Sequence, residues 1–146
     1  MQLARPSLLV RVTCDVLLIL AVFGVLALTT GSADGSSTVN LSFGQEIQRA
    51  LDNPFGAPMV NLVGNLVLFA PIGFLLRFGH RWSLLAVTFT SGLFSVGIEC
   101  AQYVLGRAAD VDDVVLNTTG ALVGALVASV FLVRGRTNTR AGVEVG

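Results

Sequence analysis

Polar side chains interrupt two consecutive apolar stretches of this sequence near the point where they meet. Glu99 and Gln102 lie near the end of one stretch, and Asp113 and Asn117 lie near the start of the next. A charged side chain at the centre of a membrane helix costs roughly 2.5 to 3.5 kcal/mol on insertion scales, so it needs a partner or a function. Arg107 lies in the turn between the stretches, and its guanidinium suits a phosphate or a carboxylate. These residues predict a polar site near one face of a membrane.

Further polar residues are predicted at the same end of the bundle. Asn61 and Asn65 are four positions apart, as are Asp113 and Asn117, so each pair shares one helix face. Asp112 precedes a predicted helix, where a carboxylate favours the N-terminal dipole, and we expect it to act as a cap. The candidate ligand-binding or functional residues are polar and share this end of the bundle; they are Asn61, Asn65, Glu99, Gln102, Arg107, Asp110, Asp113 and Asn117. The sequence contains no residue spacing typical of a metal site, and we predict neither a metal nor a cofactor.

Composition places the chain in a membrane. Of its 146 residues, 53% are hydrophobic and only 12% are charged, whereas soluble domains are about 25% charged. The mean hydropathy of +0.79 is typical of a membrane protein. The net charge is zero, so nothing indicates nucleic-acid binding. The length suits one domain with about four spanning helices of roughly 20 residues each.

Four apolar stretches predict an all-α membrane protein, a bundle of four transmembrane helices. The predicted spans are about 8–30, 59–78, 83–105 and 113–133. Together they form one membrane domain over residues 8–133. Residues 1–7 are predicted to be a cytoplasmic N-terminus, and residues 134–146 a disordered cytoplasmic tail.

The first apolar stretch carries two charged residues. Arg11 and Asp15 are four positions apart and can pair on one helix face. A cleaved signal peptide would also place basic residues before an apolar run, but this run is long and Asp15 interrupts it. Cys14 lies in this stretch and Cys100 in the third, so we expect them at opposite ends of the bundle without a disulfide.

The loop over residues 31–58 predicts a short helix between the first and second spans. Phe43, Ile47 and Leu51 recur every four residues with polar side chains between them. This pattern is typical of an amphipathic helix that lies in the membrane interface, and Pro54 would follow its end. It could act as a lid over the outer face. A loop that only touches lipid is an equally good interpretation.

Arginine is distributed unequally between the two predicted ends of the bundle. Arg49 and Arg107 lie at one end. The remaining basic residues, all arginines, lie at the other; they are Arg5, Arg11, Arg77, Arg81, Arg134, Arg136 and Arg140. Cytoplasmic loops carry the excess of basic residues, so both termini are predicted in the cytoplasm and the polar site on the extracytoplasmic side. His80 is expected in the short loop between the second and third spans.

Three segments resemble the VanZ-like family of small bacterial membrane proteins. They are NLVGNLVLFAPIGFLL, IECAQ and GRAADVDDVVLNTTGALVG, and the resemblance covers roughly residues 40–133. The residues that match the family's motifs are Asn65, Phe69, Pro71, Gly73, Glu99, Gln102, Arg107, Asp110, Asp113, Asn117 and Gly120. The resemblance implies a protein of the cell envelope with a role linked to glycopeptide antibiotics, because the family's namesake is associated with low-level teicoplanin resistance. It implies no settled biochemical activity.

Three functions are compatible with the predicted site. The first is a binding protein that takes a lipid-linked wall precursor or a glycopeptide, with membrane lipids as its other partners. The second is a membrane enzyme acting on a lipid-linked substrate, with Glu99 and Asp113 as acid and base. The third is a structural protein whose polar cluster only packs helices. We favour binding, because the sequence shows no nucleophile with a neighbouring base and no metal motif. Four spans without an inverted repeat disfavour a transporter.

Overall fold

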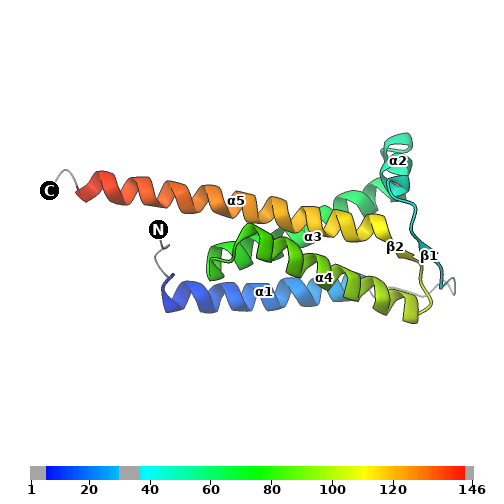
Figure 1. Cartoon of the computed structure of the whole chain (residues 1–146), viewed down its shortest axis with the longest axis horizontal. Coiled ribbons are helices and arrows are strands. Elements are labelled where there is room, and N and C mark those ends of the chain that lie inside the picture. The colour runs from blue at the N-terminus through cyan, green and yellow to red at the C-terminus, as the bar shows by residue number, and fades with distance from the viewer. Residues whose placement is uncertain (1–5, 30–36, 144–146) are drawn as a thin grey trace.

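The computed structural model describes residues 6–29 and 37–143, with side chains for residues 6–28 and 37–134. In this part of the chain, four long helices and one short helix are joined by turns and two very short strands (Figure 1). The elements in chain order are α1 (Leu8–Thr29), β1 (Val39–Asn40), α2 (Gln45–Asp52), α3 (Ala57–His80), α4 (Leu84–Val104), β2 (Ala109–Asp110) and α5 (Val111–Val143). The long helices contain four segments that are long and apolar enough to cross a membrane: Leu8–Leu28, Ala57–His80, Leu84–Val104 and Val111–Arg134. The predicted fold class, four spans with a short helix between the first two, is confirmed.

Two helices differ in length from the prediction. α3 begins at Ala57 and already contains Pro58, because proline fits the first helical turn, where its missing N–H is not needed. It continues through His80, so the histidine predicted to be in a loop is the last residue of the helix. α5 is helical through Val143, and it therefore extends into the segment for which the sequence predicted a disordered tail. No proline follows Val133 to end it.

Helices α3 and α5 approach each other backbone to backbone through glycines. A Cβ atom on Gly120 would collide with the carbonyl oxygen of Leu66, and one on Gly124 would collide with that of Ala70. Gly73 on α3 faces the backbone of α5 in the same way. In a membrane, small residues let helices approach closely and gain van der Waals contact where the hydrophobic effect does not drive association. The spacing of Gly120 and Gly124 therefore sets how close α3 and α5 come.

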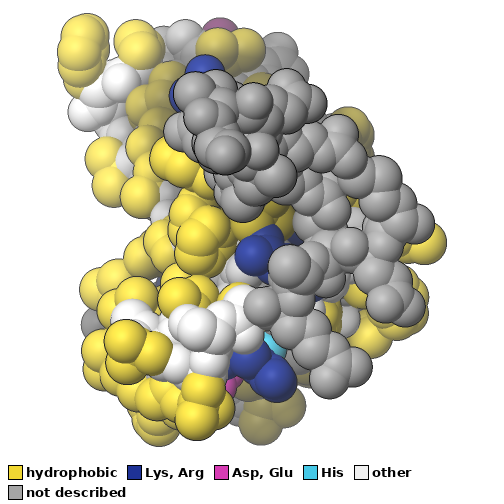
Figure 2. Space-filling view, turned by 90° about the vertical axis from the view of Figure 1, so that its left-hand side faces the viewer, with side chains coloured by type: hydrophobic (Ala, Val, Ile, Leu, Met, Phe, Trp, Pro, Cys, Tyr) yellow, Lys and Arg dark blue, Asp and Glu magenta, His cyan; other side chains and the backbone are white. Residues whose placement is uncertain are grey.

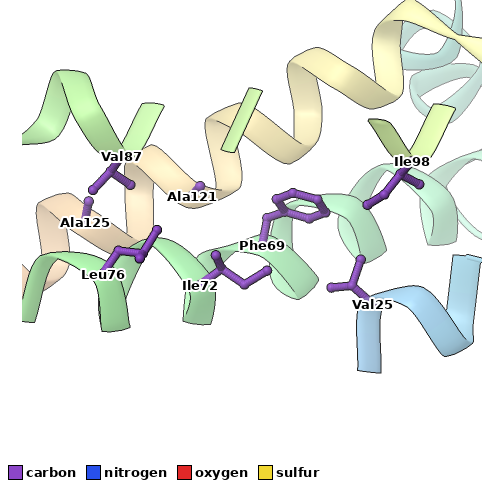
Figure 3. Packing of buried hydrophobic residues seen from close by; sticks show 8 residues of the cluster. All are labelled: Val25, Phe69, Ile72, Leu76, Val87, Ile98, Ala121 and Ala125. Atoms are coloured by element: carbon purple, nitrogen blue, oxygen red, sulfur yellow. The ribbon is translucent and has the colours of Figure 1, made fainter. Parts of the chain in front are cut away.

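The apolar core contains side chains from all four long helices. Figure 3 shows its members pointing toward one another; they are Val25, Phe69, Ile72, Leu76, Val87, Ile98, Ala121 and Ala125. Phe69 is 1% exposed and packs on Phe94 with ring centroids 5.8 Å apart. Large apolar side chains such as Leu85 and Phe89 are exposed on the outside, as a helix surface facing lipid tails requires.

The two ends of the bundle are built differently. Figure 1 shows α2, β1 and β2 together at one end and both chain termini at the other. The two strands are parallel, with Val39 beside Ala109 and Asn40 beside Asp110. This pairing joins the chain before α2 to the turn between α4 and α5, so the loops at this end form one layer.

The end that carries the termini contains basic side chains and the histidine among apolar ones (Figure 2). His80 Nε2 lies 2.9 Å from Asp15 Oδ1, so Asp15 pairs across helices with His80 rather than with Arg11 on its own helix. The sequence prediction was wrong here, because α3 extends far enough to bring His80 against α1. Cys14 and Cys100 are both free.

Candidate functional site

The carboxylate of Asp112 holds α2 in place. It accepts hydrogen bonds from the backbone N–H groups of Gly44 at 2.7 Å and Glu46 at 2.8 Å, and the residue is 1% exposed. The first N–H groups of a helix have no partner within the helix, and Gly44 at the N-cap offers no side chain to them. Asp112 supplies both the acceptor and the negative charge that this end favours. Asp112 therefore caps α2, and not α5, the helix to whose first turn it belongs.

Asp110 connects α4, β1 and α5. Its Oδ1 accepts the N–H of Asp112 at 2.9 Å, which makes Asp110 the cap of α5. Its Oδ2 accepts from Asn40 Nδ2 at 2.8 Å, and its own N–H donates to Glu99 Oε2 at 2.8 Å. This candidate residue therefore fixes the turn after α4, and it orients the Glu99 carboxyl through its backbone.

Asp113 binds both asparagines predicted to share its end of the membrane. Its Oδ1 accepts from Asn65 Nδ2 at 2.6 Å and from Asn61 Nδ2 at 3.0 Å. The Asn61 amide also lies 3.4 Å from Glu46 Oε1. One carboxylate thus joins α5 to two turns of α3, and Asn61 extends the network to α2.

Asn117 lies deeper between α4 and α5. Its Nδ2 donates to Ser95 Oγ at 2.8 Å, and both side chains are buried. Its Oδ1 is also buried and has no hydrogen-bond partner among the described residues. The sequence analysis missed Ser95. A signal was present, because Ser95 precedes Glu99 by four residues and therefore lies on the same face of α4.

A cavity of about 660 Å³ lies among these groups. Every residue of the predicted site except Asp110 lines it. The polar residues on its wall are Glu46, Asn61, Asn65, Glu99, Gln102, Arg107, Asp113 and Asn117, and the remainder of the wall is apolar side chains and Gly64. The helices α1 to α5 and the turn after α4 all contribute to the wall. Glu46 was not among the candidates, because only the folded position of α2 brings it to the cavity.

The turn that carries Arg107 is shaped by a glycine. Gly106 follows α4 with a φ of 80°, a conformation that glycine adopts without strain. The N–H of Arg107 then donates to the carbonyl of Gln102 at 3.0 Å, which closes the turn. Arg107 lines the cavity together with Gln102.

Comparison with known proteins identifies the family. A family model described as VanZ/LLP1 matches residues 15–132. The chain belongs to the VanZ/LLP1 family. This match contains every residue that lines the cavity, so the candidate site of this VanZ/LLP1 protein lies wholly within the family's common part. No curated protein and no solved structure matches the chain.

The cavity of this VanZ/LLP1 protein offers hydrogen bonds and charge inside a bundle of apolar helices. Glu99 is 6% exposed and Asn117 2%, so their polar atoms lie in surroundings where hydrogen bonds are electrostatically stronger than in water. Within the described residues, no group of three or more His, Cys, Asp or Glu side chains is placed to hold a metal ion.

Proposed function

We propose that this VanZ/LLP1 protein is a binding protein of the bacterial cell envelope. Its cavity takes the polar group of a lipid-linked wall precursor or of a glycopeptide, and through this binding the protein modulates susceptibility to teicoplanin. The observation that carries the proposal is the cavity of about 660 Å³, whose polar wall is assembled inside a bundle of membrane-spanning helices. Binding pockets for small molecules are concave, largely apolar and fitted with a few placed polar groups, and this cavity has that character.

The location of the cavity supports access from outside the cell. Figure 1 shows the start of α1, the end of α3 and the start of α4 at the end of the bundle opposite α2. Arg11 belongs to the first turn of α1, Arg77 to the last turn of α3, and Arg81 caps the end of α3. Arg49 and Arg107 lie at the end that holds the cavity. Basic residues are enriched on the cytoplasmic side of membrane proteins, so this asymmetry favours an extracytoplasmic cavity with both termini in the cytoplasm.

The types of residue on the wall suit the binding of polar groups. Among the described residues that line the cavity there is no Ser, Thr, Cys, Lys or His, so a covalent mechanism would need one of the carboxylates Glu46, Glu99 and Asp113 as its nucleophile. Arg107 can hold a phosphate or carboxylate with its planar fork of donors. Amide side chains such as Gln102 can bond the hydroxyl and amide groups of a sugar or peptide.

A susceptibility assay with three variants of the cavity wall tests the proposal. Wild type, Glu99→Gln, Arg107→Ala and Asp113→Asn are expressed in a sensitive Gram-positive host, and the inhibitory concentrations of teicoplanin and vancomycin are measured. We expect wild type to raise the teicoplanin value and the three variants to lose the effect at equal membrane abundance. Asp52→Asn is the matched control, because Asp52 is an exposed acid of α2 outside the cavity.

Each other outcome has a distinct meaning. If wild type leaves both inhibitory concentrations unchanged, the role in glycopeptide susceptibility is wrong for this chain. If the variants accumulate poorly while Asp52→Asn does not, the polar cluster packs the helices and carries no binding function.

A further inference from the structure

The cavity lies close beneath one surface of the membrane. Trp82 precedes α4 and Tyr103 lies in its last turn, with exposed fractions of 38% and 43%. Tryptophan and tyrosine are enriched where a membrane meets water. Glu99 lines the cavity and precedes Tyr103 by four residues, which is about 6 Å along a helix axis. The cavity therefore lies at the depth where lipid head groups meet their chains.

Helix α2 lies over the cavity at the end of the bundle. Figure 1 shows α2 there, directed across the long helices. Asp112 binds the backbone at the start of α2, and Glu46 of this helix lines the cavity. The amide nitrogen of Asn61 lies 3.4 Å from Glu46 Oε1, which joins α2 to α3 at the same place. A ligand that came from water along the bundle axis would therefore meet α2 first.

The cavity reaches the surface of the bundle on one side, between α1 and α3. Of the residues that line it, four are exposed; they are Leu28, Ala57, Val60 and Asn61, and we call them the mouth. Leu28 in the last turn of α1 is 67% exposed, and Val60 in the first turn of α3 is 71% exposed. Both turns belong to segments that are long and apolar enough to cross a membrane, so the mouth opens toward lipid.

The apolar core ends one turn deeper than the mouth. Val25 of α1 is 1% exposed and packs in the core with Phe69 and Ile98 (Figure 3). Leu28, three residues later, is already exposed. On α3, Gly64 lines the cavity one turn after Val60, and a Cβ on it would meet no atom of the described residues within 4 Å. The space behind the mouth is therefore left open by a glycine, where a larger side chain would fill it.

We propose that the ligand of this cavity is a polar lipid, which enters sideways from the bilayer through the mouth. Its head group lies among the polar residues of the wall, and its chains extend out between α1 and α3. Because the mouth lies at the depth of the head groups, the polar part moves sideways and does not cross the apolar chains. A water-soluble ligand such as a glycopeptide would lose the hydration of its polar groups on this route. The inference rests on the proposed binding function and selects a lipid from the ligands that this function leaves open.

Two pairs of variants test this inference. Gly64→Leu fills the space behind the mouth, and Gly97→Leu adds the same side chain at a glycine of α4 that also has open space but lies outside the cavity wall. Val60→Trp enlarges a residue of the mouth, and its control is Val63→Trp, at an exposed position of α3 outside the wall. The second pair decides the question if Gly64→Leu accumulates poorly.

Binding is measured by calorimetry on the purified full chain in a non-ionic detergent. The probes are short-chain phosphatidylglycerol and phosphatidylethanolamine, and the water-soluble head groups that remain when their chains are removed. We expect at least one lipid to bind wild type about ten-fold or more tightly than its own head group, because the chains stay in apolar contact. Gly64→Leu and Val60→Trp should each weaken this binding about five-fold or more, because the added side chain occupies the space that the lipid needs. Gly97→Leu and Val63→Trp should keep it.

The outcomes separate this inference from the proposed function. Head groups that bind as tightly as their lipids mean that the ligand comes from water, so the inference is wrong and the binding function stands. Equal lipid binding in the mouth variants and their controls overturns the inference as well, because the lipid is then bound elsewhere. If neither lipid binds wild type, the inference fails, and the susceptibility assay decides the proposed function independently.

Discussion

Helices α3 and α5 touch along one part of their length and separate along another. Around Gly73, Gly120 and Gly124, each backbone lies against the other and no side chain fits between them. Around Asn65 and Asp113, the same two helices are joined by side-chain hydrogen bonds and border a cavity. The change occurs within a single turn, because Gly120 follows Asn117 by three residues. The size of the residues between α3 and α5 therefore decides where the two helices pack closely and where they border the cavity.

Substitutions at two glycines of α3 are expected to give the largest difference in the stability of the folded protein. A Cβ on Gly73 would collide with the backbone of Ala121, whereas one on Gly64 meets nothing within 4 Å. Gly73→Ala should destabilise the folded protein by about 1 to 3 kcal/mol through overpacking. Gly64→Ala should be tolerated, and it could stabilise the helix by up to about 1 kcal/mol because alanine is the better helix former. Denaturant unfolding in detergent measures both.

This comparison can be contradicted directly. Equal losses of stability in the two variants would show that α3 does not distinguish contact from cavity along its length. Membrane abundance of each variant, measured by blot, gives the same comparison in cells.

Asp112→Ala is expected to have an intermediate and local effect. The change removes both acceptors from the first turn of α2, and loss of a helix cap costs about 0.5 to 2 kcal/mol. Amide hydrogen exchange should therefore accelerate over Gln45–Asp52 while the exchange of α3 stays slow. Asp52→Ala, at the far end of α2, is the control. If exchange in α2 does not change, Asp112 does not hold the short helix over the cavity.

Substitutions at two serines of α4 are expected to give the smallest change in stability. Ser95 bonds Asn117, whereas the buried Oγ of Ser91, one turn earlier, has no partner among the described residues. Ser95→Ala should cost about 0.6 kcal/mol, the average for a hydrogen bond between membrane helices. Ser91→Ala should be neutral or slightly stabilising, because it removes a buried hydroxyl that makes no bond. Thermal unfolding of the pair in one detergent measures the difference, and a reversed order would exclude Ser95 as the partner that fixes Asn117.

Much of the fold and the members of the candidate site could be predicted from the sequence for a simple reason. Each membrane span must be apolar over about 20 residues, so any polar residue within a span is visible as an exception. Asn65, Glu99, Asp113 and Asn117 are such exceptions, and the alternating direction of consecutive spans places them at one end. The structure brings all four to one cavity.

Residues whose position depends on another element could not be predicted in this way. Glu46 is one polar residue among several on α2, and it reaches the cavity only because Asp112 binds the start of that helix. Asp15 has a plausible partner four residues away on its own helix, yet it pairs with His80 of α3. In both cases the deciding quantity is the distance between helices, which local spacing does not contain.

The sequence by itself determined which segments cross the membrane, which residues are polar within them and which end they share, because hydropathy and helical period are local properties. Only the tertiary structure decided which atoms bond one another. The sequence alone would also allow an ion pair between Asp113 and Arg107. In the folded protein, Asp113 Oδ1 accepts hydrogen bonds from Asn61 and Asn65. The same packing leaves Asn117 Oδ1 without a bonded donor in the described chain. Hydrogen bonds require partners about 3 Å apart, and helix packing alone sets that distance.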